Sequence, residues 1–208
     1  MVSRVRRSDS FARRAPSREP YDYVLIVCEG GKTEPHYFKA LIAAERLSSA
    51  NIHVTSGGGH TDPVSIVKIA EGNLEKGYDR IYCVFDRNGH VNYDEALARI
   101  ANHGSGKLRA ITSWPCFEVW ILLHFNYSTA PFQKTGNRSP CDNVVKALVE
   151  HIDNYEKGRA TIFNEISSKL EMAMTNARKL AKYNKETNST NPATLAFELV
   201  HYLKNLKK

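Results

Sequence analysis

The stretch "VLIVCEGG", residues 24–31, does most to decide the fold. A short, continuous apolar run that is rich in valine and isoleucine and bounded by glycine is typical of a strand buried on both faces of a parallel sheet. A second run of the same character, "RIYCVF" at 80–85, is followed by Asp86. Glu29 and Asp86 therefore each follow a predicted strand, at the sheet edge where open α/β proteins bind ligands.

Between residues 23 and 113 the pattern alternates between strand and helix. Strands are predicted at 23–28, 51–56, 80–85 and 108–113, and helices at 35–47, from 63 to about 77, and at 93–102. Asp62 followed by Pro63 is a typical N-cap with proline at the first helical position. Repeated strand–helix units predict an α/β fold, a parallel sheet with helices on both faces.

Strand signals fade beyond residue 114. The length of "CFEVWILLHF", 116–125, favours a helix over a strand, with Trp120 and His124 in the core. Two dipeptides, Ser139-Pro140 and Asn191-Pro192, each predict an N-cap followed by proline at the first helical position. About three helices are expected between 140 and 206.

The length of the chain suits one domain with an appended helical part, and its positive charge favours binding to polyanions. The 208 residues hold 29 Lys+Arg against 22 Asp+Glu, a formal net charge of +7, and nucleic acid is the commonest polyanion. Residues 1–20 contain six arginines and few large apolar side chains, which predicts a basic arm: a strap for nucleic acid, a targeting sequence or a solubilising tail. The predicted division is 1–20 arm, 21–125 core and 126–208 helical extension.

The cysteines and the apolar stretches predict a cytoplasmic protein. Cys28, Cys83, Cys116 and Cys141 show no C-x-x-C spacing. Cys28 and Cys83 fall inside apolar runs and are expected to be small core residues of a reducing compartment, with no disulfide framework. No apolar stretch approaches the roughly 18 residues that a membrane-spanning helix needs. No membrane association is expected.

Two acids at the ends of neighbouring strands predict a site for a hard divalent cation. If the two strands are adjacent, Glu29 and Asp86 face one site, because right-handed crossovers bring both carboxyl ends to the same edge. Mg²⁺ prefers one or two carboxylates together with water and substrate phosphates. The expected cofactor is Mg²⁺ or Mn²⁺, with DNA or RNA bringing the phosphates.

Several motifs in order resemble the RloB-like family of bacterial phage-defence, or abortive-infection, proteins. The motifs are "CEGGKTEPHYF", "VFDRNGH", "SWPCFEVWILLHF", the arginine-rich lead-in and an Asn-Pro-x-Thr segment near the end. The resemblance covers nearly the whole chain. It implies a Toprim-like core, a domain that occurs in topoisomerases, primases and nucleases of the overcoming-lysogenization-defect type.

The resemblance also implies roles for the acids. Glu29 takes the place of the Toprim glutamate, a general acid/base or metal contact, and Asp86 that of the first aspartate of the Asp-x-Asp metal motif. The chain departs from the motif at the second aspartate, where Asn88 stands. An amide oxygen is a neutral ligand, so the missing charge is expected from Glu34 or Glu118.

Other residues near the two strand ends are candidates for binding phosphate and moving protons. Lys32 and the N–H groups of Gly30 and Gly31 can hold a phosphate at a strand-to-helix turn, or the glycines serve only the turn. Arg87 is grouped with them as a phosphate-binding residue. His90 follows Asp86 at a spacing that suits a proton donor, although a lone histidine is more often structural.

The leading hypothesis is a metal-dependent nuclease in which Glu29, Glu34 and His90 are catalytic and Glu29, Asp86, Asn88 and Glu118 hold the metal. The alternative is a catalytically impaired module that binds nucleic acid or a nucleotide, which Asn88 favours. A primase or a topoisomerase is disfavoured, because the chain shows no zinc-binding element and has little room for a second catalytic domain. A protein partner from the defence system is possible, and the sequence leaves the oligomeric state open.

Overall fold

A computed structural model describes residues 22–206 except for 50, 61 and 88. The predicted basic arm, residues 1–20, lies outside the described residues, as does Asn88. The fold is α/β, with a mostly parallel five-stranded sheet flanked by helices and a helical C-terminal part, which agrees with a Toprim-like core.

The sheet has the strand order β2-β1-β3-β4-β5. Its strands are β1 (Val24–Cys28), β2 (Ile52–Ser56), β3 (Arg80–Asp86), β4 (Leu108–Trp114) and β5 (Ala193–Thr194). The first four are parallel to one another, and β5 pairs antiparallel with the end of β4. Because β1 lies between β2 and β3, its carboxyl end is next to that of β3.

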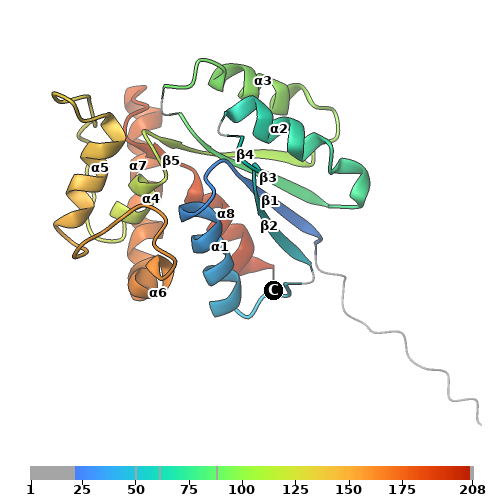
Figure 1. Cartoon of the computed structure of the whole chain (residues 1–208), viewed down its shortest axis with the longest axis horizontal. Helices are drawn as coiled ribbons and strands as arrows, with labels where there is room; N and C mark the ends of the chain where they lie inside the picture. The colour runs from blue at the N-terminus through green and yellow to red at the C-terminus, as the bar shows by residue number, and fades with distance from the viewer. Residues whose placement is uncertain (1–21, 50, 61, 88, 207–208) are drawn as a thin grey trace, which may run out of the picture.

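Helices cover both faces of the sheet (Figure 1). On one face lie α2 (Pro63–Glu71) and α3 (Tyr93–Asn102), and on the other lie α1 (Thr33–Ala44) and α8 (Ala196–Asn205). All five residues of β1 are buried. Val24, Ile26 and Cys28 join the core beneath α1, while Leu25 and Val27 join the core beneath α2. This alternation explains the continuous apolar run in the sequence.

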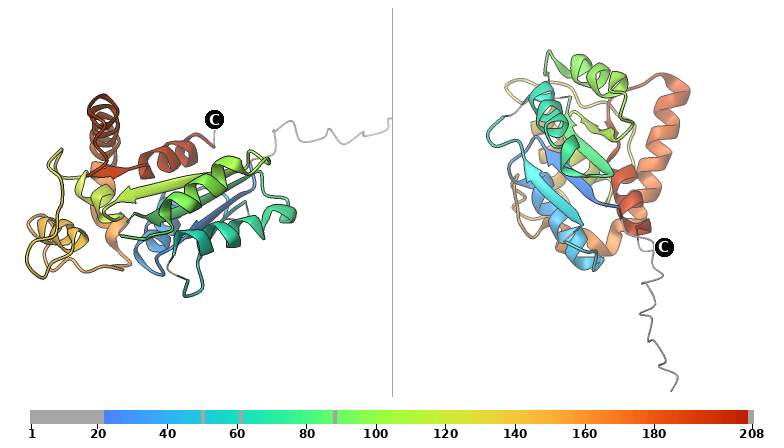
Figure 2. Two further views of the ribbon diagram at one scale, coloured as in Figure 1. Left: turned by 90° about the horizontal axis from the view of Figure 1, so that it is seen from above. Right: turned by 90° about the vertical axis from the view of Figure 1, so that its right-hand side faces the viewer.

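The remaining helices lie beyond the end of the sheet at which the parallel strands finish (Figures 1 and 2). They are α4 (Glu118–Leu122), α5 (Pro140–Val149), α6 (Ile162–Ile166) and α7 (Leu170–Thr187), with a short 3₁₀ segment at Ser167–Lys169 between α6 and α7. A second 3₁₀ segment, Leu74–Lys76, lies between α2 and the start of β3. A capping box at Ser139 and Asp142 starts α5, and Asp62 caps α2 as predicted. Trp120 and His124 are fully buried, so their placement in the core is confirmed.

Four predictions of secondary structure were wrong in detail. Asn191-Pro192 is a cis peptide bond that leads into β5, and the following helix begins only at Ala196. The two residues of β5 are too few to carry a periodic pattern. The region from 140 to 206 holds four α-helices where about three were expected. The helix predicted at 116–125 is only the five residues of α4, and the helix predicted from 63 to about 77 ends at Glu71, before a separate 3₁₀ segment at Leu74–Lys76.

The prediction that the cysteines form no disulfide is correct for Cys28 and Cys83 and wrong for Cys116 and Cys141. Cys28 and Cys83 are free and buried in the core. Cys116 and Cys141 form a disulfide, with their Cα atoms 5.7 Å apart. Cys116 lies just before α4 and Cys141 in the first turn of α5, and the packing of these two helices brings the cysteines together. Spacing along the chain did not reveal this packing.

No described helix is both long enough and apolar enough to cross a membrane.

Candidate metal centre

The ends of β1 and β3 place Glu29 and Asp86 side by side. The parallel register pairs Cys28 with Val84, and the Glu29 N–H donates to the Val84 carbonyl over 2.8 Å. The backbone N–H of Asp86 donates to Oε2 of Glu29 over 2.9 Å. The strand adjacency predicted from the sequence is therefore confirmed. Both carboxylates lie at the carboxyl edge of the sheet.

Glu34 returns to the same place because it lies in the first turn of α1. Its side chain folds back over Gly30, so closely that a Cβ built on Gly30 would lie 2.1 Å from Oε2 of Glu34. Only glycine leaves room for this arrangement. Glu34 is 6% exposed, so its carboxylate is held in the protein with little freedom to move.

Glu118 reaches the same place from another part of the chain, as the first residue of α4, which begins four residues after the end of β4. It is 2% exposed. Its contacts are long: Lys157 Nζ and Cys141 Sγ lie 3.5 and 3.7 Å from Oε2, and the Tyr155 hydroxyl lies 3.5 Å from Oε1. A buried carboxylate normally has closer partners than these.

These acids line one cavity of about 440 Å³. The lining consists of the β1–α1 turn, the end of β3, the start of α4 and a segment that follows α5: Glu29, Gly30, Gly31, Lys32, Thr33, Glu34, Asp86, Glu118, Lys157 and Gly158. Four carboxylates thus converge on one space. The acids singled out in the sequence are together here, and Gly30, Gly31 and Lys32 share the cavity with them.

Burial and the closeness of these acids to one another raise their pKa values. Burial, with the nearby charges of Glu118 and Glu29, raises the pKa of Glu34 to about 7. Burial and the charges of Glu34 and Glu118 raise the pKa of Asp86 well above its usual value. Burial also raises the pKa of Glu29, although the Asp86 N–H and His90 act in the opposite direction. Without a cation, the acids of the cluster therefore hold their protons more tightly than isolated carboxyl groups do.

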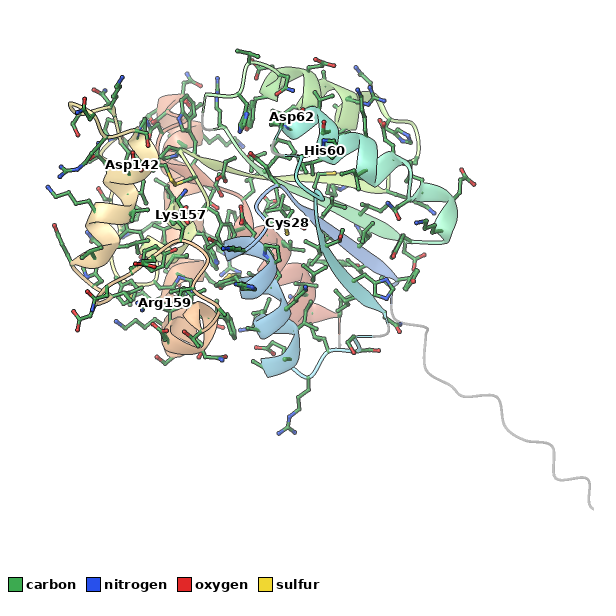
Figure 3. The ribbon with its side chains drawn as sticks, in the orientation of Figure 1. Cys28, His60, Asp62, Asp142, Lys157 and Arg159 are labelled. Atoms are coloured by element: carbon green, nitrogen blue, oxygen red, sulfur yellow. A yellow bond between two sulfur atoms is a disulfide. The ribbon has the colours of Figure 1, made fainter. Side chains whose placement is uncertain are left out.

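Lys157 is a candidate that the sequence did not reveal. It lies between α5 and α6, a segment labelled in Figure 3 by Lys157 and Arg159. The next residue, Gly158, donates its N–H to Oγ1 of Thr33 over 2.8 Å, and its carbonyl lies 3.1 Å from Nδ1 of His36. These contacts fix the segment to the start of α1. The positive charge of Lys157 opposes, without overcoming, the rise in the pKa of Glu34 and Asp86 that burial and the other acids cause.

The other predicted residues lie around the cavity. His90 contacts the acid cluster directly, since its Nε2 is 2.9 Å from Oε1 of Glu29. The Arg87 guanidinium lies over the ring of Trp114, 4.0 Å from its centre, and 5.1 Å from that of Tyr93. Arg87 is not among the residues that line the cavity, and its role in phosphate binding stays a prediction. The position of Asn88 lies outside the described residues.

The donor set suits a hard divalent cation. Oxygen ligands that carry negative charge and lie on rigid elements are what Mg²⁺ and Mn²⁺ require. Glu29, Asp86, Glu34 and Glu118 can supply those oxygens, and the 440 Å³ cavity leaves space for water and a substrate phosphate. Burial raises the pKa values of these acids most, and repulsion between the carboxylates adds to that effect; a bound cation would offset the repulsion.

Comparison with known proteins identifies the family. The fold and the acid cluster define an α/β protein with a Toprim-like sheet and an acidic centre at its carboxyl edge. The family model described as RloB-like protein matches residues 24–203, and the chain belongs to this family. No curated protein matches the chain. No solved structure matches it either.

Proposed function

We propose that this protein is a Mg²⁺- or Mn²⁺-dependent nuclease that hydrolyses phosphodiester bonds of DNA or RNA. The convergence of four carboxylates on one open cavity carries the proposal. A polyanion would be repelled by these acids unless a cation lay between them, and the net charge of +7 favours a polyanionic partner. A bound divalent cation would polarise the scissile phosphate and lower the pKa of the attacking water.

Under this proposal the residues in and beside the cavity hold the metal, supply negative charge and move protons. Glu29 and Asp86 hold the metal, and Glu34 and Glu118 supply the charge that a neutral Asn88 lacks. His90, in contact with Glu29, moves a proton to or from the reacting oxygen, with Glu34 as the other catalytic carboxyl.

Phosphate binding falls to groups at the mouth of the cavity. Lys32 is exposed at the start of α1, beside the N–H groups of Gly30 and Gly31. The side chain of Lys157 is 49% exposed, so its ammonium can leave Glu118 and contact a phosphate oxygen once a cation neutralises the acids.

A second candidate function is a module that binds nucleic acid or a nucleotide and has lost the chemistry. Asn88 is the observation that favours it, because a Toprim metal motif has a second aspartate at that position. Asn88→Asp distinguishes the two. The nuclease proposal expects this change to raise metal affinity and the cleavage rate, whereas a binding module that cleaves nothing should gain no cleavage.

A proposal for the biological role of the protein rests on its membership of the RloB-like family. We propose a cytoplasmic role in phage defence, with a partner protein of the defence system that controls the nuclease. We also propose that 21–125 is the catalytic core and that 126–208 is an extension which completes the cavity by supplying Lys157.

The nuclease proposal is tested by incubating the purified protein with DNA and RNA in Mg²⁺ or Mn²⁺. Wild type should cleave, and Glu29→Gln and Asp86→Asn should each reduce the rate at least 100-fold, the order of loss expected when a catalytic or metal-binding group is removed. Glu186→Gln, on an exposed part of α7, is the matched control and should cleave normally. Binding without cleavage in either metal would favour the binding module.

A further inference from the structure

The two disulfide-forming cysteines and Glu118 form a second group of side chains that could hold a metal ion, and this group shares Glu118 with the acid cluster. Cys116, Glu118 and Cys141 are all buried, and one ligand atom from each lies within 4.8 Å of the others. We propose that, when the disulfide is reduced, these three residues bind Zn²⁺ or a similarly soft divalent cation. The proposal concerns binding and does not depend on nuclease activity.

The elements around this group hold its members in place. Cys116 and Glu118 lie two residues apart where β4 leads into α4, and Cys141 lies in the first turn of α5, which begins with a capping box. The packing of α4 against α5 therefore fixes the third ligand relative to the first two. Ligands on packed elements of this kind can hold a metal without a large rearrangement.

The surroundings of Glu118 also support the proposal. The three side-chain partners described above lie 3.5 to 3.7 Å from its oxygens, although the residue is only 2% exposed. One of those partners is Cys141 itself. A cation between the carboxylate and the two sulfur atoms would give this buried charge the close partner that the described contacts do not.

The ligand chemistry separates this group from the acid cluster. Thiolates and a carboxylate are ligand types that Zn²⁺ binds, and its usual four-coordinate geometry would leave one position open for water. The acid cluster offers oxygen alone, which suits Mg²⁺ and Mn²⁺. Glu118 borders both groups, so a cation held by the cysteines would compete for this carboxylate.

The change from disulfide to metal site requires a reductant. A dithiol donates two electrons and two protons, the Cys116–Cys141 bond breaks, both cysteines become thiols, and the dithiol becomes a disulfide. Binding of Zn²⁺ then displaces the two thiol protons. In the oxidised protein no thiolate is present at this place and the site is absent.

The test uses Co²⁺ as a spectroscopic probe of the full-length protein, reduced with a phosphine and freed of reductant without oxygen. Reduced wild type should bind one equivalent of Co²⁺ with the absorption of a cobalt–thiolate bond, and added Zn²⁺ should abolish that absorption. Oxidised wild type should show none. Cys116→Ser/Cys141→Ser should lose it, while Cys83→Ala, a change to a free core cysteine, should retain it.

Two further variants locate the metal and guard against misfolding of the double variant. Glu118→Gln keeps both thiols and should weaken Co²⁺ binding at least tenfold. Asp86→Asn, in the acid cluster, should keep the thiolate absorption even if it abolishes cleavage. The proposal is overturned if reduced, folded wild type shows no thiolate absorption, if the double cysteine variant keeps it, if Glu118→Gln leaves the affinity unchanged, or if Asp86→Asn removes it.

Discussion

Gly30 is the residue whose replacement most directly tests the geometry of the acid cluster. A methyl group there would collide with the carboxylate of Glu34, whereas a Cβ at Gly31 has no atom within 4 Å. Gly30→Ala should therefore displace Glu34 and lower the affinity for Mn²⁺ at least tenfold, and Gly31→Ala should leave that affinity nearly unchanged. Calorimetric titration of both variants checks this. Equal affinities for the two would contradict the placement of Glu34.

Glu34 also predicts how stability depends on pH. Its pKa in the folded protein is about 7, above the usual 4.5, so the folded state binds the proton more tightly than the unfolded state. This contribution to stability is fully present below pH 4.5 and is lost as the pH rises through about 7. In a chelator, the melting temperature of wild type should fall between pH 5.5 and 8.5.

Glu34→Gln isolates this effect. The variant lacks the titrating carboxyl, so its melting temperature should fall less over the same pH range, and at pH 8.5 the variant should be the more stable protein. Mg²⁺ should stabilise wild type at pH 8.5 and stabilise Glu34→Gln less. A wild-type melting temperature that rises with pH would contradict this account of the cluster.

At the scale of elements, the conformation of the segment between α5 and α6 and its contact with the start of α1 depend on Gly158. This glycine has φ +84°, and a Cβ there would lie 2.9 Å from the side chain of Lys32. Gly158→Ala should lower the free energy of unfolding by about 1–3 kcal/mol, and it should weaken nucleic-acid binding because Lys157 moves with the segment. Thermal unfolding and a binding titration measure the two effects.

Gly136 provides the matched control for that change. Its φ is +58°, and a Cβ there has no atom within 4 Å. In Gly136→Ala the alanine would be strained by the positive φ, but its Cβ would collide with no other atom, and the change lies far along the chain from Lys157. It should lower stability but leave nucleic-acid binding unchanged. Equal loss of binding in both variants would mean that the segment carrying Lys157 has no special part in binding.

For the whole molecule, the sequence predicted those parts of the fold that short runs of neighbouring residues determine. The apolar runs of β1 and β3 indicated the parallel sheet, and the acids after them indicated its candidate functional edge, although the repeated strand–helix pattern did not determine that β1 and β3 are neighbours. Lys157 could not be found this way. Its segment is fixed to the start of α1 by a contact between residues 125 positions apart, and no local pattern encodes such a contact.

The same reasoning explains the other differences. β5 is two residues long and is defined by its pairing with Ser113 and Trp114, not by its own composition. Cys116 and Cys141 are 25 residues apart and meet only because α4 packs against α5. Sequence reasoning was reliable where neighbouring residues decide the structure, and it failed where packing between distant segments decides it.

The central claim, that the acid cluster is a divalent-cation site, is tested most directly by measuring free Mn²⁺ by electron paramagnetic resonance at pH 8. Wild type should reduce the signal of free Mn²⁺, excess Mg²⁺ should restore it, and Asp86→Asn should leave it almost unchanged, while Glu186→Gln behaves as wild type. If wild type leaves the signal unchanged, or if Asp86→Asn binds Mn²⁺ as tightly as wild type, the metal site proposed here does not exist.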